Sequence, residues 1–170
     1  GDPVAARFVP LSRPSLGPEE EEAVVEILRS GWLTSGHQIS AFEQAFSEAV
    51  GAAHTVAVNS CTAAIHLCLA DCGVKPGDEV ISTPITWAST GNTLLNMGAR
   101  VVFVDVEPDT LNLDPAQVEA AITERTRAII PVHLAGHPCD MRALRAIAKK
   151  HQIALIEDAA HALGARYGET

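Results

Sequence analysis

Short apolar runs alternate with helical patterns along most of the chain, and this alternation limits the possible folds more than any other feature. Five runs are candidate strands, at residues 55–59, 79–83, 101–105, 128–132 and 153–157. Each is too short and too apolar to be a half-exposed edge strand. Helical patterns lie between them, near residues 62–72, 88–97, 115–124 and 141–151. This order predicts a three-layer α/β fold, in which helices cover both faces of a mostly parallel sheet.

Two further helices are expected before this series. Gly17-Pro18 is followed by four glutamates, which favour the positive end of a helix dipole, and proline suits the first helical position. Ser30-Gly31 predicts the end of that helix. The second helix is expected to carry an apolar face made of Ile39, Phe42 and Phe46. We therefore expect an N-terminal arm with the first helix over residues 1–36 and one larger domain over residues 37–170.

Composition excludes several classes of protein. The 170 residues are 47% hydrophobic and 19% charged, as in globular proteins that bury a core. The net charge of −9 argues against binding to nucleic acid or to an anionic membrane surface. No apolar run is long enough to span a bilayer.

The four cysteines indicate neither a disulfide framework nor a zinc site, because they form no C-x-x-C pair and match no zinc-binding spacing. Cys68 and Cys72 lie one helical turn apart in an apolar stretch, where buried free thiols are expected. We expect no metal ion, and a reduced cytoplasmic location.

In parallel sheets, functional groups gather where the strands end. Ser60, Cys61, Thr62 and Ala63 follow the first candidate strand and begin a helix. Small residues, hydroxyls and free N–H groups at such a point can bind an anion, for which a phosphate is a natural candidate. The alternative is that Ser60 or Thr62 is an ordinary helix cap. Neither a nucleotide-binding P-loop nor a dinucleotide fingerprint is present.

Two acids, Glu157 and Asp158, end the last candidate strand. Because side chains alternate along a strand, they are expected to point to opposite faces, so that only one of them can face a given ligand. A carboxylate at this position can keep a cofactor's ring nitrogen protonated. A helix cap or a magnesium ligand is the alternative.

Trp87 and His161 also follow strand ends. The indole of Trp87 could stack on a flat ring, although a core or surface tryptophan is the more common finding. His161, three residues after Asp158, gains meaning only beside that acid. No G-x-S-x-G or H-E-x-x-H motif supports a hydrolase.

The chain resembles the DegT/StrS-type sugar aminotransferases, and especially the branch that forms UDP-4-amino-4-deoxy-L-arabinose. The resemblance extends over nearly the whole chain and rests on six stretches in family order: residues 8–17 (FVPLSRPSLG), 31–36 (GWLTSG), 60–66 (SCTAAIH), 86–90 (TWAST), 128–136 (AIIPVHLAG) and 156–164 (IEDAAHALG). Cys61 departs from the pattern, since many relatives have Gly or Ala there.

The resemblance implies a pyridoxal 5'-phosphate (PLP) enzyme with the large domain of fold-type I transferases, incomplete in this chain. Asp158 would pair with the pyridine nitrogen, Trp87 would stack on the ring and His161 would lie against it. Thr62 would hold the phosphate with the Ala63 amide.

The implied reaction moves an amino group from glutamate to a 4-keto sugar nucleotide, with a UDP-4-keto-pentose as the favoured acceptor and lipid A modification as the setting. Such enzymes are cytoplasmic homodimers, with active sites at the subunit interface. Thr34 and Ser35 would lie near the substrate entrance.

The lysine that binds the cofactor covalently in this family is expected beyond Thr170. Lys75 lies in a turn, and Lys149-Lys150 lie on the polar face of a helix. We therefore expect an N-terminal fragment of a longer enzyme, in which residues 55–59 would lack a neighbouring strand. Two alternatives stay open: a PLP-dependent sugar dehydratase relative with histidine in place of the lysine, and a catalytically inactive binding domain that keeps the fold.

Overall fold

The computed structural model describes residues 13–168, so the stretch at residues 8–17 lies partly outside the described residues. The chain forms two compact units, of which the first ends at Ala57 and the second begins at Val58. The division expected after residue 36 falls within the first unit and stays a prediction.

The first unit contains α1 (Pro18–Ser30) and α2 (His37–Val50). As the sequence predicts, α1 begins after Gly17, whose N–H donates to Glu20 Oε2 at 2.6 Å, and it ends at the left-handed Gly31. On α2 the Phe42 and Phe46 rings contact each other, with centroids 5.7 Å apart.

Residues 55–59 do not form the predicted strand. No strand of the described part of the chain pairs with them, and the Val56 side chain is 74% exposed. The Ala57 N–H instead donates to Glu43 Oε1 at 2.8 Å. An extended segment becomes a strand only when a neighbouring strand pairs with its backbone N–H and C=O groups. Residues 55–59 have the composition of a strand but lack such a neighbour among the described residues.

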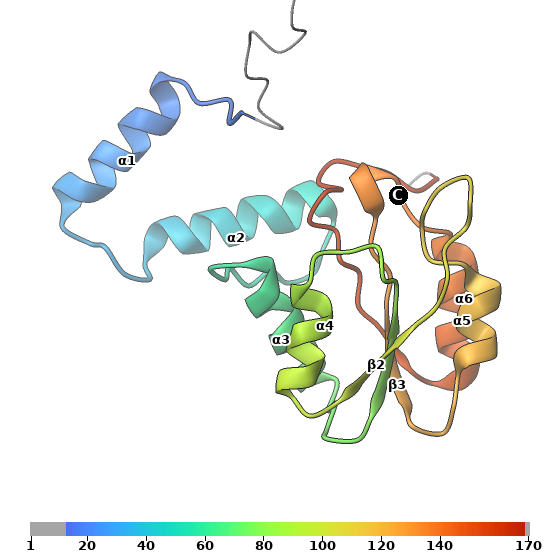
Figure 1. Cartoon of the computed structure of the whole chain (residues 1–170). Coiled ribbons are helices and arrows are strands. Elements are labelled where there is room, and N and C mark those ends of the chain that lie inside the picture. Colours follow the sequence, from blue (N-terminus) through green and yellow to red (C-terminus); the bar gives the residue numbers. More distant parts are fainter. Residues whose placement is uncertain (1–12, 169–170) are drawn as a thin grey trace, which may run out of the picture. The chain divides into compact units, whose positions relative to one another are not determined.

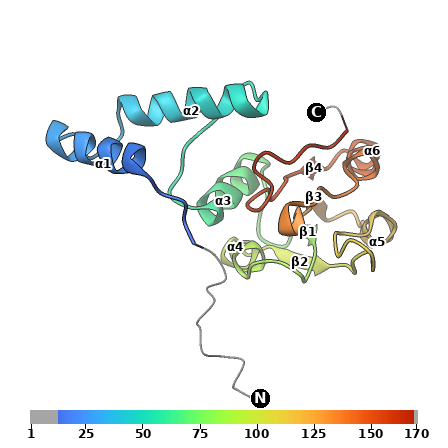
Figure 2. The same cartoon turned by 90° about the horizontal axis from the view of Figure 1, so that it is seen from above.

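The second unit contains a parallel four-stranded sheet with the order β2-β1-β3-β4 (Figures 1 and 2). The strands are β1 (Glu79–Ser82), β2 (Arg100–Phe103), β3 (Thr126–Ile130) and β4 (Ala154–Leu155). The expectation that none is a half-exposed edge is wrong for β2, which lies at one end of the sheet and exposes Phe103.

Helices cover both faces of this sheet, so the predicted three-layer α/β architecture is confirmed (Figure 1). Val80, Ala128 and Ile130 pack against α3 (Cys61–Asp71) and α4 (Ser89–Asn96). On the other face, Ile81 and Ile129 pack with α5 (Pro115–Ala121) and α6 (Met141–His151). Successive strand residues thus enter different cores, as the period of two requires.

Three local details refine the expected elements. The helix expected to reach residue 124 ends at Ala121, because Ile122 already has an extended backbone. A short 3-10 turn, η1 (Leu134–Gly136), follows β3 and contains a left-handed Ala135 with φ 52°. Cys68 and Cys72 are exposed rather than buried, since only Ile65 and Leu69 of α3 are enclosed in the described structure.

Neither a membrane-spanning helix nor a group of residues able to hold a metal ion occurs among residues 13–168.

Candidate functional site

The strand order places a site at the edge of the sheet where the strands end. From β1 the chain moves outward to β2 and then returns to β3 on the other side of β1. In open parallel sheets, ligands bind at the carboxyl end of the strands where the direction reverses in this way. A cavity of about 280 Å³ lies there, lined by Ile85, Thr86, Trp87, Val132, Leu134, Asp158, Ala160 and His161. Trp87, Asp158 and His161, predicted separately from the sequence, are therefore brought together.

Asp158 is the buried acid of this cavity, with 6% of its surface exposed. Its backbone continues the pairing of β3 and β4, because its N–H donates to the Pro131 carbonyl at 2.9 Å and its carbonyl accepts from His133 N at 3.1 Å. Its Oδ1 accepts from the Ala160 N–H at 3.2 Å. The Thr90 hydroxyl donates to Oδ2 over a long 3.5 Å, which leaves that oxygen able to accept a stronger hydrogen bond from a ligand.

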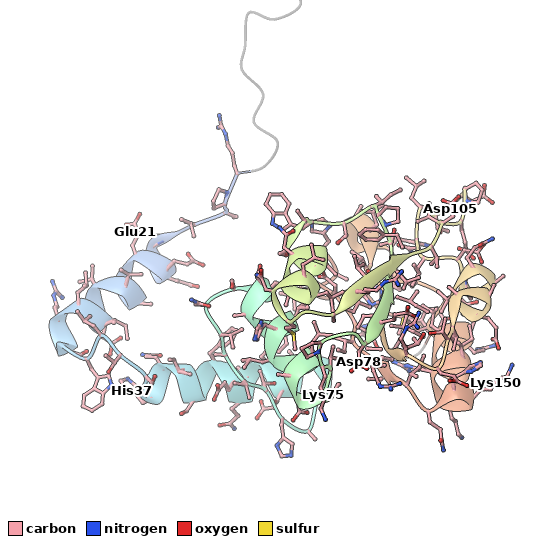
Figure 3. The ribbon with its side chains drawn as sticks, turned by 60° about the horizontal axis from the view of Figure 1, so that its bottom comes forward. Glu21, His37, Lys75, Asp78, Asp105 and Lys150 are labelled. Carbon is pink, nitrogen blue, oxygen red and sulfur yellow. The ribbon has the colours of Figure 1, made fainter. Side chains whose placement is uncertain are left out.

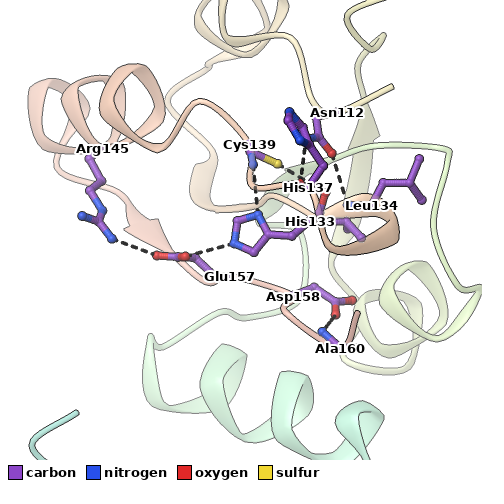
Figure 4. A network of polar contacts seen from close by, with 10 residues as sticks. Asn112, His133, Leu134, His137, Cys139, Arg145, Glu157, Asp158 and Ala160 are labelled. Atoms are coloured by element: carbon purple, nitrogen blue, oxygen red, sulfur yellow. Dashed lines mark hydrogen bonds and ion pairs between the residues drawn. The ribbon is translucent and has the colours of Figure 1, made fainter. Parts of the chain in front are cut away.

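Glu157 points to the opposite face, as the alternation predicts. Its Oε2 lies 3.1 Å from His133 Nε2, and its Oε1 accepts from Arg145 on α6 at 3.3 Å (Figure 4). The Cys139 N–H donates to His133 Nδ1 at 3.1 Å, so Nδ1 carries no proton and the ring proton lies on Nε2, which donates to Glu157. The hydrogen bond from His133, and more weakly Arg145, holds the pKa of Glu157 below its ordinary value. Only Asp158 of the two acids is thus available to a ligand in the cavity.

The N-terminus of α3 lies beside Asp158. The Cys61 thiol is 3.7 Å from Asp158 Oδ1, and burial, together with the charge of Asp158, raises the pKa of Cys61. Ser60 is the helix cap, since its Oγ accepts from the Ala63 N–H at 3.1 Å. The Ala63 amide, expected to hold a phosphate, is therefore engaged by Ser60. The N–H groups of Cys61 and Thr62 belong to the first turn, where a helix offers them no internal partner, and they can receive an anion.

Trp87 and His161 form the outer walls of the cavity. The Trp87 side chain is 81% exposed although it is large and apolar, which suits a ring that stacks on a ligand. His161 is also exposed, and its backbone carbonyl packs closely against the η1 turn: a Cβ on Gly136 would lie 3.0 Å from that oxygen.

Thr34 and Ser35 belong to the first unit, in the segment between α1 and α2. The Ser35 carbonyl there accepts from the Trp32 indole N–H at 2.8 Å. Their role near a substrate entrance stays a prediction.

None of the three lysines lines the cavity. Lys75 precedes β1 in a turn, with its N–H donating to Asp78 Oδ2 at 2.8 Å, and Lys150 contacts Glu119 from α6 (Figure 3). Lys149 is exposed on the same helix.

Sequence reasoning did not single out Thr90, which contacts Asp158, or Leu134, which lines the cavity. Both lie within stretches that carry the family resemblance, at 86–90 and 128–136, and their positions within those stretches were the available signal. The buried Asn112, which binds the η1 turn, was missed as well. The sequence feature that could have pointed to Asn112 is a polar side chain between two leucines, Leu111 and Leu113.

Comparison with known proteins adds independent findings. A model of the DegT/DnrJ/EryC1/StrS aminotransferase family matches residues 14–170. Spore coat polysaccharide biosynthesis protein SpsC of Bacillus subtilis (strain 168) is 51% identical over 160 residues, which are 94% of this chain and 41% of that protein.

Two solved structures have the same fold and detectable sequence identity. S. venezuelae DesV in complex with ketimine intermediate superposes with a TM-score of 0.85 and 44% identity, over 88% of this chain and 40% of that one. GDP-4-keto-6-deoxymannose-3-dehydratase with a trapped PLP-glutamate geminal diamine gives 0.89 and 30%, over 96% of this chain and 44% of that one. The chain therefore spans about two fifths of the length of these relatives.

Proposed function

The chain belongs to the DegT/DnrJ/EryC1/StrS aminotransferase family, and from this we propose that it is the N-terminal part of a PLP-dependent sugar-nucleotide aminotransferase. The observation that carries the proposal is the cavity beyond β1, β3 and β4, where a buried carboxylate, an exposed indole and a helix N-terminus meet. The carboxylate suits a pyridine nitrogen, the indole suits the pyridine ring, and the helix N-terminus suits a phosphate.

The residues fit this cofactor. When bound, PLP acts as an electron sink, provided that its pyridine nitrogen stays protonated. Asp158 Oδ2, with only its long contact to Thr90, can accept the hydrogen bond from that nitrogen. Trp87 would stack on the ring, and His161 lines the same cavity. The Thr62 hydroxyl and the N–H groups of Cys61 and Thr62 are the donors we assign to the phosphate, while the Ser60 cap holds the turn in shape.

We assign glutamate as the amino donor and a 4-keto sugar nucleotide as the acceptor. A UDP-4-keto-pentose is favoured by the stretches around residues 12–17, 86–90 and 128–136, and lipid A modification is the corresponding setting. The Bacillus relative bears the name of a spore coat polysaccharide protein instead. The nature of the sugar is therefore the part of the proposal that substrate assays must decide.

The remaining assignments concern the longer protein. We place the covalent lysine beyond Thr170, and we propose a cytoplasmic homodimer in which Thr34 and Ser35 lie near the substrate entrance. Partners would be the two substrates, without nucleic acid or membrane.

One alternative has specific support. The similarity to GDP-4-keto-6-deoxymannose-3-dehydratase means that a dehydratase could share this front half and differ at the residue in the lysine position. An inactive binding domain is the third possibility, and it predicts no covalent attachment of the cofactor.

The test uses the full-length protein with added PLP. We expect a visible absorbance band that borohydride removes, a labelled lysine peptide from beyond residue 170, and transfer of the glutamate amino group to a 4-keto sugar nucleotide. Cofactor binding without a labelled lysine would contradict the aminotransferase and is expected both of the dehydratase and of an inactive binding domain. Protein that stays colourless with PLP would contradict the proposal and leave the binding domain.

A further inference from the structure

Asn112 is a buried amide that the proposed chemistry does not use. It lies in the segment between β2 and α5, with 2% of its surface exposed. Its Oδ1 accepts from the Leu134 N–H at 3.2 Å, and its Nδ2 donates to the His137 carbonyl at 2.9 Å (Figure 4). Since the first partner can only donate and the second can only accept, the orientation of the amide is fixed. One side chain thus spans the whole η1 turn.

The backbone around Asn112 is itself held firmly. Its N–H donates to the Thr110 hydroxyl at 3.1 Å, and its carbonyl accepts from the Glu107 N–H at 2.9 Å. Leu111, just before it, has a left-handed backbone with φ 58°. Such a conformation is costly for a leucine and persists only where the surroundings impose it.

The turn that Asn112 binds contains the same left-handed conformation and contacts the cavity. Ala135 has φ 52°, and the neighbouring Gly136 has φ 85°, which glycine adopts without strain. The Leu134 side chain lines the cavity, and Gly136 packs so closely on His161 that a Cβ would lie 3.0 Å from its carbonyl oxygen. The position of η1 therefore sets the positions of two cavity walls.

We propose that Asn112 is a positioning residue for the cofactor cavity, which acts through the η1 turn to hold Leu134 and His161 in place. This inference rests on the proposed PLP site. Asn112 lines no part of the cavity itself. Its two hydrogen bonds join the β2–α5 segment to the η1 turn, which forms part of the cavity wall.

The test compares two variants of the full-length protein. Asn112→Asp has nearly the same shape and keeps the acceptor for Leu134, but it loses the donor to His137 and places a carboxylate against that carbonyl. Val118→Ala is the matched control, because it removes buried apolar contacts from α5 in the same half of the fold without touching η1. Both should lower the melting temperature of the cofactor-free protein. Only Asn112→Asp should weaken PLP binding, by up to about tenfold, because binding must then restore the cavity wall that the lost hydrogen bond held in place.

A double-mutant cycle with His161→Ala separates positioning from general destabilisation. If Asn112 acts through His161, Asn112→Asp should change PLP affinity and the circular dichroism of the bound cofactor much less in that background. Purely additive effects, or a PLP affinity within twofold of wild type at a lowered melting temperature, would overturn the inference.

Gly136→Ala provides a second route if Asn112→Asp does not fold, because it leaves Asn112 intact, strains the η1 backbone at φ 85° and presses a methyl group against the His161 carbonyl. We expect a similar loss of PLP affinity, and an unchanged affinity would overturn the inference. Wild-type protein that does not bind PLP would overturn the proposed function together with the inference. Wild-type binding that is lost in Asp158→Asn but unchanged in Asn112→Asp and Gly136→Ala would overturn the inference alone.

Discussion

Replacing Asp158 by asparagine is the most direct perturbation of the proposed site. The amide can keep its oxygen toward the Ala160 N–H, now 3.2 Å from Oδ1, and turn its NH₂ toward the Thr90 hydroxyl, which can accept. The fold should therefore survive. The oxygen that would accept from the pyridine nitrogen, however, is replaced by a donor without charge.

The expected loss follows from that exchange. A hydrogen bond to a charged group contributes about 1.5–3 kcal/mol, and each 1.4 kcal/mol is a factor of ten in affinity. Asp158→Asn should weaken PLP binding to the full-length protein by about 10- to 150-fold, and activity should fall further because the ring nitrogen is no longer held protonated.

Equilibrium dialysis of PLP, together with the melting temperature of the cofactor-free protein, measures this effect. Asp105→Asn is the control. Asp105 also follows a strand at this edge of the sheet, but its Oδ1 only accepts from the Val106 N–H at 2.8 Å. The reasoning is refuted if Asp158→Asn binds PLP within threefold of wild type, or if Asp105→Asn weakens binding equally.

Three further predictions concern the stability of the described fold. Ser60→Ala should lower the free energy of unfolding by about 1 kcal/mol and Ser60→Gly by only a few tenths, because Ser60 caps α3; equal losses in urea unfolding would contradict this cap. Glu157→Gln should destabilise the protein at neutral pH, with a difference that disappears in acid, because the stabilisation from a lowered pKa exists above the ordinary value of 4.5 and is lost as pH falls through the folded-state pKa; a pH-independent difference would argue against it. Leu94→Ala should cost about 2–5 kcal/mol and Leu95→Ala less than about 0.5 kcal/mol, since the first is buried and the second exposed on α4; similar unfolding midpoints for the two would be inconsistent with the packing of α4.

The sequence predicted the elements whose cause is local. Periodicity located four of the five strands and the helices between them, and the period of two correctly sent Glu157 and Asp158 to opposite faces. The helix start after Gly17 followed from neighbouring residues alone. Where an element depends on distant partners, its composition alone is not enough. Residues 55–59 have the composition of a strand but do not form one, and the expectation that this segment would lack a neighbouring strand is confirmed for the described residues.

The site was predictable in part for the same reason. Asp158, Trp87 and His161 were each recognisable from a strand end, because that rule needs only the chain order of strands and helices. Contacts between residues on different strands and helices were not predictable from the sequence. Nothing in the local sequence says that Thr90 of α4 reaches Asp158, 68 positions away, or that Asn112 binds a turn 22 residues later. Such pairs depend on which strands are neighbours, and a list of strands in chain order does not give their order in the sheet.

The order β2-β1-β3-β4 explains why these residues meet at one point. Right-handed crossovers place a helix on one face when the chain moves one way along the sheet, and on the other face when it moves back. The step from β1 to β2 therefore leaves α4 on the Asp158 side, while the steps to β3 and β4 put α5 and α6 behind Glu157. The reversal opens the carboxyl edge between β1 and β3, and β4 brings Asp158 to it. A single change of direction thus brings the Asp158 carboxylate and α4 to one side of the sheet, at the cavity. It leaves the Glu157–His133 contact, α5 and α6 on the other side.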